Sequence, residues 1–380
     1  MNKTYQFRLY PTKKQQATLK SWLALCCEVY NAALQERRDA YHMAGISIGF
    51  AHQCAELPEC KQVRPDLAEV NSQVVQDALK RVDLAFTAFF RRCEAGEQPG
   101  YPRFRSRFRY DSLTFKQYGN SFSLTREGKQ KGKLILSKIG HVKMVMHRPI
   151  QGTPKTAIVK RTPTGKWYVS ICCTAVEPNR LPASSEQVGI DVGLKTFAYL
   201  STDEHIDNPR FFRQEETHLA KAQRKVSKAP SKTPAKQKRR KVVARIHERI
   251  RNRRHDFIGQ QVAVLVKRFG LIAVEALMVR NMLKNPKLAK SIADAAWSAF
   301  YTHLIAKAEE AERLLVRVNP AYTSQTCSAC GHRQEMPLSM RVYECPNCGL
   351  VMDREHNASR TILAQAVGRH GHVVQEAPSL

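Results

Sequence analysis

The alternation of apolar and polar side chains changes its period along the N-terminal part of the chain. Residues 3–10 alternate with a period of two, which predicts a half-buried strand that Pro11 ends. Residues 11–99 then carry apolar side chains at helical spacing, and Thr12 with Gln15 forms the capping-box sequence of a helix start. This part of the sequence therefore predicts one strand followed by a helical domain.

Short alternating segments return between residues 112 and 174, separated by turn sequences such as Gly119–Asn120. Several short strands at this spacing are typical of a small barrel or a curled sheet, which the first strand could complete. The pattern predicts a β-barrel made of residues 1–10 and 100–180, with the helical residues inserted into it.

Farther along the chain, the apolar runs are those of buried strands that end in carboxylates. Residues 187–191 end in Asp191 before a glycine turn, and residues 271–275 end in Glu275. A single aspartate at a strand end is as often a turn former as a functional group, but the repetition favours a shared site. A helix is also predicted over residues 291–311.

A third acidic position is the segment 353–355, Asp-Arg-Glu. Three separated acids at the ends of elements could converge to hold two divalent ions. Carboxylate oxygens are the ligands that Mg²⁺ prefers, so the pattern favours a Mg²⁺ site.

Two CxxC pairs stand directly before this acidic segment, Cys327 with Cys330 and Cys345 with Cys348. Their spacing fits the four corners of a tetrahedral zinc ion, and a closed four-cysteine site leaves no open coordination position. We therefore expect a structural Zn²⁺ ion. The alternative, four unrelated buried cysteines, does not account for the paired spacing or for the glycine that follows each pair.

The composition adds a strong charge to this picture. The chain has 380 residues, of which 43% are hydrophobic, so two or three domains with packed cores are expected. The 62 Lys and Arg residues against 33 Asp and Glu residues leave a net charge of +29. Such an excess favours nucleic acid as the partner over an anionic membrane surface. With no apolar run long enough to span a bilayer and no signal peptide, a cytoplasmic protein with no membrane partner is predicted.

Two segments concentrate the basic side chains. Residues 101–110 interleave arginines with aromatic residues, which can pair with phosphates and stack on bases, although an edge strand with solvated arginines is an alternative. Residues 221–254 hold fifteen Lys or Arg residues against one acid, and a solvated helix face is the alternative there. The predicted nucleic-acid contacts are Arg103, Arg105, Arg107, Arg109, Arg239, Arg240, Arg251 and Arg254.

Seven sequence segments, spread over nearly the whole chain, form one further pattern. They are residues 5–11 (YQFRLYP), 102–104 (PRF), 166–168 (KWY), 189–195 (GIDVGLK), 208–210 (NPR), the paired CxxC segments, and 357–359 (NAS). Together they resemble the TnpB family, the OrfB-type proteins of insertion sequences that are related to type V CRISPR effectors.

The resemblance implies a multidomain fold of mixed α+β and α/β class. It implies a wedge β-barrel interrupted by a helical recognition domain, and then a RuvC-like nuclease domain of RNase H fold with an inserted zinc ribbon. The corresponding domain boundaries are 1–10 with 100–180 for the barrel, 11–99 for the recognition domain, 186–320 with 351–367 for the nuclease, 321–350 for the ribbon, and 368–380 for a disordered tail.

The activity that the resemblance implies is RNA-guided cleavage of double-stranded DNA beside a short motif, with a guide RNA from the end of the mobile element. Asp191 matches the first RuvC carboxylate and Glu275 the second. The family usually has Asp-Arg-Asp-x-Asn at the third, where this chain has Glu355, with Asp353 retained before it.

Two-metal hydrolysis is then expected, with Asp191 holding both Mg²⁺ ions and Glu275 and Glu355, or Asp353, holding one each. The extra methylene of Glu355 moves the carboxylate by roughly 1 Å, which could slow the reaction. One alternative is therefore a guided DNA-binding repressor that does not cleave. A second is a guide-independent accessory of transposition whose acids are structural. The expected setting is the nucleoid of a bacterium or archaeon.

Overall fold

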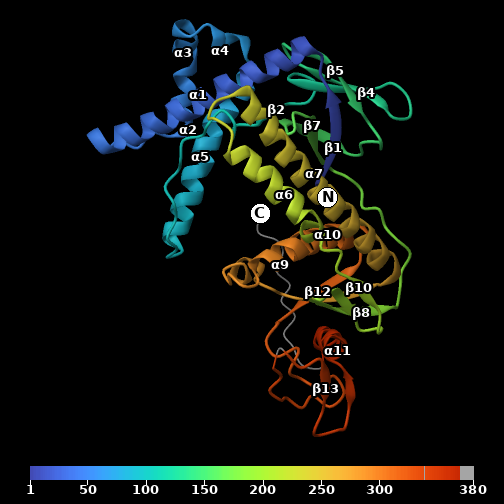
Figure 1. The fold of residues 1–380 in the computed structure, drawn as a ribbon. Coiled ribbons are helices and arrows are strands. Elements are labelled where there is room, and N and C mark those ends of the chain that lie inside the picture. The colour runs from blue at the N-terminus through green and yellow to red at the C-terminus, as the bar shows by residue number, and fades with distance from the viewer. Residues whose placement is uncertain (338, 369–380) are drawn as a thin grey trace. The chain divides into compact units, whose positions relative to one another are not determined.

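The computed structural model describes residues 1–337 and 339–368, which belong to two compact units, Met1–Glu177 and Pro178–Leu380 (Figure 1). Each unit has its own sheet and its own buried core. None of the helices in these ranges is both long enough and apolar enough to cross a membrane. The predicted disordered tail lies, from residue 369 on, outside the described residues.

The first unit combines one curled sheet with a group of helices. Its helices are α1 (Lys13–Ala44), α2 (Phe50–Ala55), α3 (Leu57–Val63), α4 (Asp66–Glu69) and α5 (Ser72–Glu94). Its strands are β1 (Lys3–Tyr10), β2 (Ser112–Lys116), β3 (Phe122–Arg126), β4 (Lys131–Leu136), β5 (Gly140–Val145), β6 (Thr153–Arg161) and β7 (Trp167–Thr174).

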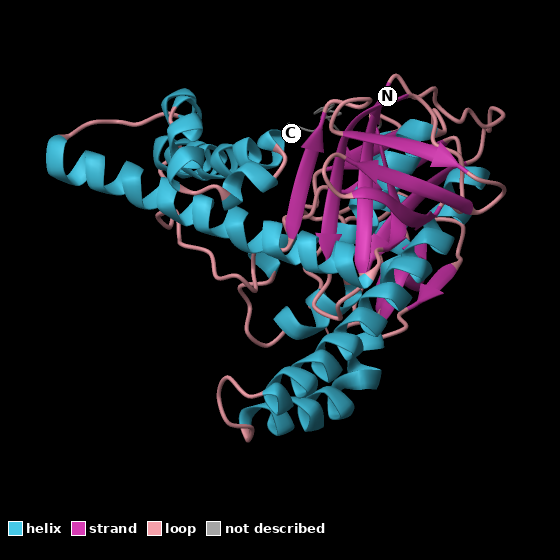
Figure 2. Cartoon of the chain, turned by 90° about the horizontal axis from the view of Figure 1, so that it is seen from above, coloured by secondary structure: helices cyan, strands magenta, loops and turns pink. Residues whose placement is uncertain are grey.

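The strands of the first unit form an antiparallel sheet in the order β2-β6-β7-β1-β5-β4-β3. Figure 2 draws the strands in magenta. The N-terminal strand β1, half-buried as the alternating pattern predicted, lies in the middle, where Phe7 pairs with Val169 and Leu9 with Met144. A flat sheet of this width would separate its edge strands by roughly 29 Å. The five-residue connection between edge strands β2 and β3 spans at most about 21 Å, so the sheet must curl.

Of the small barrel or curled sheet that the sequence predicted, the structure forms a curled half-barrel. Within residues 1–177, which are described in full, no ladder joins β2 to β3, and one isolated bridge pairs Tyr118, in the connection between them, with Phe122. Buried side chains of α1, α5 and the sheet form one continuous apolar cluster.

Helix α1 begins as the sequence predicted. The Thr12 hydroxyl accepts the Gln15 backbone N–H at 3.3 Å, and the Gln15 side chain accepts the Thr12 N–H at 3.0 Å. Helix α1 ends at Gly45, whose left-handed conformation (φ 66°) suits a residue without a side chain. Trp22 and Tyr30 are among the buried residues that join α1 to the sheet and to α5.

The second unit contains a mixed five-stranded sheet, a small hairpin and six helices in its described part. Its strands are β8 (Gln187–Val192), β9 (Thr196–Leu200), β10 (His205–Asp207), β11 (Leu271–Glu275), β12 (Leu314–Val318), β13 (Val342–Glu344) and β14 (Val351–Asp353). Its helices are α6 (Phe211–Ser227), α7 (Pro234–Arg268), α8 (Val279–Met282), α9 (Ala289–Ala295), α10 (Trp297–Glu310) and α11 (Arg354–Ala366).

The sheet of the second unit has the order β10-β9-β8-β11-β12. Strands β8, β11 and β12 are parallel, so their carboxyl ends lie at one edge, while β9 returns antiparallel beside β8. Helix α11 packs directly on β8, since a Cβ atom added at Gly189 would lie 2.0 Å from the Ser359 carbonyl oxygen. A Cβ atom at Gly193 would instead approach Glu355, so α11 runs opposite to β8 and begins at the carboxyl edge of the sheet.

The single helix predicted over residues 291–311 is wrong, because the chain forms α9 and α10 with a break at Ala296. Ala296 adopts a left-handed conformation (φ 59°, ψ 40°), which redirects the chain. The break lets α9 contact α6 through the buried Asp294, while α10 packs against α7. Tertiary packing, rather than helix periodicity, decides this boundary.

Candidate functional site

Three carboxylates meet at the carboxyl edge of the second sheet. Asp191 lies on β8, Glu275 ends the neighbouring parallel strand β11, and Glu355 lies in the first turn of α11. Burial raises the pKa of Asp191 well above its ordinary value, and the nearby Glu275 and Glu355 carboxylates raise it further, while Arg354 opposes the shift. The structure thus brings these three predicted residues together.

Glu275 is buried and is held by a residue that sequence reasoning missed. The Thr323 hydroxyl donates to Glu275 Oε1 at 2.5 Å and lies 3.2 Å from the Pro320 carbonyl oxygen. Burial raises the pKa of Glu275, and the Thr323 hydrogen bond partly offsets this rise. No sequence motif marked Thr323. It follows Tyr322, a non-glycine residue with a left-handed backbone conformation (φ 67°) that the sequence did not indicate.

Asp353 and Glu355, the two candidates for the third acid, have different surroundings. Asp353 is exposed, and its Oδ1 accepts the backbone N–H groups of Glu355 at 2.7 Å and His356 at 3.3 Å, so it caps α11. Glu355 is largely buried, with 17% of its side chain exposed, and its Oε1 lies 3.4 Å from Arg341. The geometry therefore favours Glu355 over Asp353 as the acid that faces Asp191.

The residue after Glu355 anchors the start of α11 to the β9–β10 hairpin. His356 Nδ1 lies 3.1 Å from Asp203, and the His356 ring stacks on Tyr199 at 5.5 Å. The Tyr199 hydroxyl donates to the same Asp203 carboxylate at 2.9 Å. These contacts restrict the position of the neighbouring Glu355 backbone.

Asn357 connects α11 to the first CxxC segment. Its side chain is fully buried, its Nδ2 donates to the Thr326 carbonyl oxygen at 2.8 Å, and its Oδ1 accepts the Ser328 N–H at 2.9 Å. The Thr361 hydroxyl, one turn later, lies 3.2 Å from the same Thr326 oxygen. The cysteine segment and the acidic helix are therefore joined by a buried hydrogen-bond network.

The four predicted metal-binding cysteines do form a cluster. Cys327 and Cys348 Sγ atoms are 3.6 Å apart, as are those of Cys330 and Cys345, and all four lie within 4.8 Å of one another. A hydrogen bond with Asn347 lowers the pKa of Cys330 to about 6. This set of four thiol donors could bind zinc. Among the described residues, its ligand atoms lie closer together than the oxygens of the three carboxylates.

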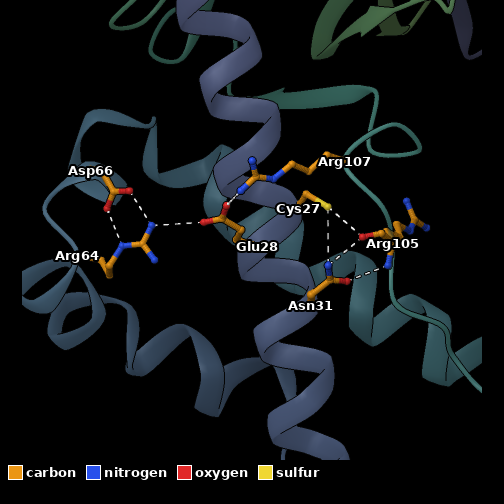
Figure 3. Close-up of polar contacts among 7 residues, drawn as sticks. All are labelled: Cys27, Glu28, Asn31, Arg64, Asp66, Arg105 and Arg107. Carbon is orange, nitrogen blue, oxygen red and sulfur yellow. Dashed lines mark hydrogen bonds and ion pairs between the residues drawn. The ribbon is translucent and has the colours of Figure 1, made fainter. Parts of the chain in front are cut away.

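The arginine-rich segment 101–110 is a loop that docks on α1, so the alternative of an edge strand is wrong (Figure 3). The Asn31 side chain bonds the backbone of Arg105 in both directions, at 2.9 and 2.8 Å, and Arg105 lies over the Tyr30 ring. Arg107 pairs with Glu28. These contacts engage Arg105 and Arg107, while Arg103 and Arg109 are exposed.

The four arginines predicted to bind nucleic acid in the basic segment 221–254 also differ in their contacts. Arg254 Nη2 lies 3.0 Å from the buried Asp294, and Arg239 donates to the Lys225 carbonyl oxygen at 2.9 Å. Both side chains therefore have structural partners that compete with nucleic acid. Arg240 and Arg251 are exposed on α7.

Three family models match separate parts of the chain. The model described as "Probable transposase" matches residues 170–286, and "Cas12f1-like, TNB domain" matches residues 297–362. A third, "Helix-turn-helix domain", matches residues 1–45, which the structure forms into β1 and the single long helix α1.

Known proteins match nearly the whole chain. A Streptomyces pristinaespiralis protein named "Putative RNA-guided DNA endonuclease" is 35% identical, over 96% of this chain and 89% of that protein. InsQ of Escherichia coli strain K12, with the same description, is 27% identical, over 99% of this chain and 96% of InsQ. The solved structure of a "Cas12f1-sgRNA-target DNA complex" shares the fold, with a TM-score of 0.62 at 14% identity over 95% of this chain and 98% of that chain. On these matches, the chain belongs to the TnpB family, the OrfB-type proteins of insertion sequences.

Proposed function

We propose that this protein is an RNA-guided DNA endonuclease of a mobile element. The observation that carries the proposal is the meeting of Asp191, Glu275 and Glu355 at one edge of a sheet with parallel strands. The names of the relatives, which describe RNA-guided DNA endonucleases, supply the substrate class.

The carboxylates fit a pair of Mg²⁺ ions on physical grounds. Buried like charges raise the pKa of Asp191, and hard cations would relieve that repulsion and accept the oxygen ligands. The Tyr301 hydroxyl is buried without a hydrogen-bond partner among the described residues, and its pKa is raised by burial, Glu275 and Asp191. An unsatisfied donor beside the carboxylates supports a bound substrate or water there.

Mg²⁺ ions bound at this edge would stabilise the charge that develops on the attacking and leaving oxygens of a phosphodiester. The chain's own residues set the geometry for this step. Asp191 interacts with both of the other acids, Thr323 orients Glu275, and Asp353 with His356 fixes the turn that carries Glu355. The Cys327 cluster, with Zn²⁺, would act structurally by holding the loop to which Asn357 is bonded.

The same proposal extends to domains and partners. The mixed sheet of the second unit supports a RuvC-like domain of RNase H type, the four-cysteine segment a zinc ribbon, and the curled sheet of the first unit a wedge domain. The net charge of +29 supports binding of a guide RNA and a DNA target. Arg103, Arg109, Arg240 and Arg251 are predicted contacts with exposed side chains and none of the pairings described above for the other four. Base pairing with the guide would select the sequence.

A guided DNA-binding protein that does not cleave is the second candidate. It is favoured by the Glu355 carboxylate, which is longer than the usual aspartate and already lies 3.4 Å from Arg341. An arginine partner competes with a metal ion for that oxygen.

Cleavage of a plasmid target by the protein, co-expressed with RNA from its flanking DNA, tests the proposal in Mg²⁺ and in EDTA. Metal-dependent double-strand breaks that disappear in Asp191→Ala would support the nuclease. Guided binding without breaks, with breaks restored in Glu355→Asp, would support the second candidate. Absence of any defined bound RNA would contradict both.

A further inference from the structure

A basic pocket lies in the second unit beside the strand that carries Asp191. It has a volume of about 540 Å³, and its walls come from the β8–β9 turn, the N-terminal end of α6, and α9. Lys195, Arg210 and Arg213 contribute three cationic side chains to it. The catalytic proposal above uses none of these residues, although the motifs 189–195 and 208–210 contain two of them.

The backbone turn at Arg210 is held in an unusual conformation by hydrogen bonds. Arg210 has a left-handed conformation (φ 46°, ψ 48°), which costs a non-glycine residue about 1 kcal/mol or more. Asn208 holds the turn, because its Nδ2 donates to the Leu194 carbonyl oxygen at 3.0 Å and its Oδ1 accepts the Arg210 N–H at 3.1 Å. Strain of this kind persists where surrounding contacts enforce it, and it often marks a functional position.

The acidic residue of the pocket does not neutralise these cations. The Asp294 carboxylate is buried and already accepts the N–H groups of Phe212 at 2.9 Å and Arg213 at 3.2 Å, together with Arg254 at 3.0 Å. Asp294 therefore also occupies the start of α6, so the helix end itself is not available to an anion. The side chains of Lys195, Arg210 and Arg213 are therefore the groups of the pocket that can bind an anion.

Two of the three cations have no ion-pair partner in the described part of the chain. Arg213 lies 3.1 Å from Glu216 and 3.4 Å from the Ser291 hydroxyl. Among residues 1–337 and 339–368, by contrast, neither the Lys195 ammonium nor the Arg210 guanidinium has an ion-pair partner. Two unpaired cations that converge on one concave surface make an anion site, and a phosphodiester matches their charge and donors.

We propose that the pocket formed by Lys195, Arg210 and Arg213 binds a backbone phosphate of the DNA strand that is presented to the carboxylates. This inference rests on the proposed nuclease function. Lys195 follows Asp191 by four residues, so the two lie at most about 14 Å apart along the chain. The bound phosphate then lies within a few nucleotides of the scissile one and sets which phosphodiester reaches the acids.

Single methylphosphonates, which remove one backbone charge, placed along the target strand test the pocket in the guided complex. With the unaltered protein, one position near the cut should slow cleavage about tenfold, as expected for one lost charge-assisted contact. Lys195→Gln and Arg210→Gln should each cleave normal DNA about tenfold more slowly and be insensitive at that position. The matched control is Lys267→Gln, in the last turn of α7 before β11 and so at the opposite end of the sheet.

Arg210→Gly controls for folding, because it removes the cation and also relieves the left-handed strain. It should keep the melting temperature and still lose the methylphosphonate effect. Full sensitivity in the Lys195 and Arg210 variants would overturn the proposal. Loss of co-purified RNA in these variants would also overturn it, because the pocket would then hold the guide strand instead.

A measurement of DNA binding without cleavage tests this inference separately from the nuclease proposal. DNA affinity of the guided Asp191→Ala complex is measured against salt, and each lost contact should reduce the log–log slope by about one. If the unaltered protein does not cleave, the nuclease proposal fails while this arm still tests the pocket. If it cleaves and the slopes match that of Lys267→Gln, the pocket proposal alone fails.

Discussion

Replacing Thr323 by valine removes the hydroxyl that holds Glu275 while nearly preserving the size of the side chain. That hydroxyl donates to Glu275 Oε1 at 2.5 Å, and both residues are buried. Hydrogen bonds to charged groups contribute about 1.5–3 kcal/mol, and valine leaves the buried carboxylate without this donor. The loss corresponds to roughly a ten- to hundredfold change in an equilibrium that needs the ionised carboxylate.

We expect Thr323→Val to raise the pKa of Glu275, because burial already raises it and the hydrogen bond is what lowers it. The charged form then needs a higher pH or a higher Mg²⁺ concentration. Guided cleavage rates should therefore fall roughly ten- to hundredfold at limiting Mg²⁺. They should recover in part as either Mg²⁺ or pH is raised.

Two variants serve as controls for this change. Thr323→Ser keeps the hydroxyl and should retain most of the activity. Thr302→Val removes a hydroxyl that donates to the Ser298 carbonyl oxygen on α10, and it should leave the Mg²⁺ dependence unchanged. If Thr323→Val has the same Mg²⁺ dependence and rate as Thr302→Val, then the Thr323 hydroxyl does not serve Glu275 and the reasoning is refuted.

Three further predictions concern stability, zinc and charge. Because the pKa of Asp191 is raised in the fold, this group favours folding at low pH and that contribution is lost as pH rises through the folded-state pKa. Asp191→Asn should therefore raise the melting temperature of the metal-free protein at neutral pH and matter less in acid; equal melting temperatures at neutral pH would contradict this. Asn357→Ala should cost about 1–3 kcal/mol of unfolding free energy and reduce zinc content, measured by denaturation and metal analysis, and unchanged values would argue against the link. Arg103→Gln and Arg109→Gln should each reduce the slope of log affinity for nucleic acid against log salt concentration by about one. Arg107, which pairs with Glu28, should give no such change when replaced by Gln. Equal slopes for the three variants would refute the distinction.

The local pattern of residue types was sufficient to predict elements whose form depends on residues close together in the sequence. The alternation of residues 3–10 predicted a strand because one face meets the core, and the Thr12 capping box formed as expected. The apolar run that ends in Glu275 became β11 with the predicted bounds. The spacing of the four cysteines likewise predicted their cluster, since two short loops can supply all its corners.

Long-range contacts decided the identity of the supporting residues. Thr323 and His356 carry no motif, and they contact partners that lie 48 and more than 150 residues away in the chain. The break at Ala296 follows from the separate packing of α9 and α10, which no periodicity records. In the first unit, helices and curled sheet share one apolar cluster, which brings together side chains that lie far apart in the sequence.

The sequence by itself determined which residue types were available: three acids at element ends, four paired cysteines and an excess of arginines. Only the tertiary structure decided how each was used. Asp353 caps a helix while Glu355 faces Asp191, and Arg254 pairs with Asp294 while Arg210 stays free of an ion pair among the described residues. The physical reason is that the effect of a charge depends on its burial and its neighbours, which folding sets across distant parts of the chain.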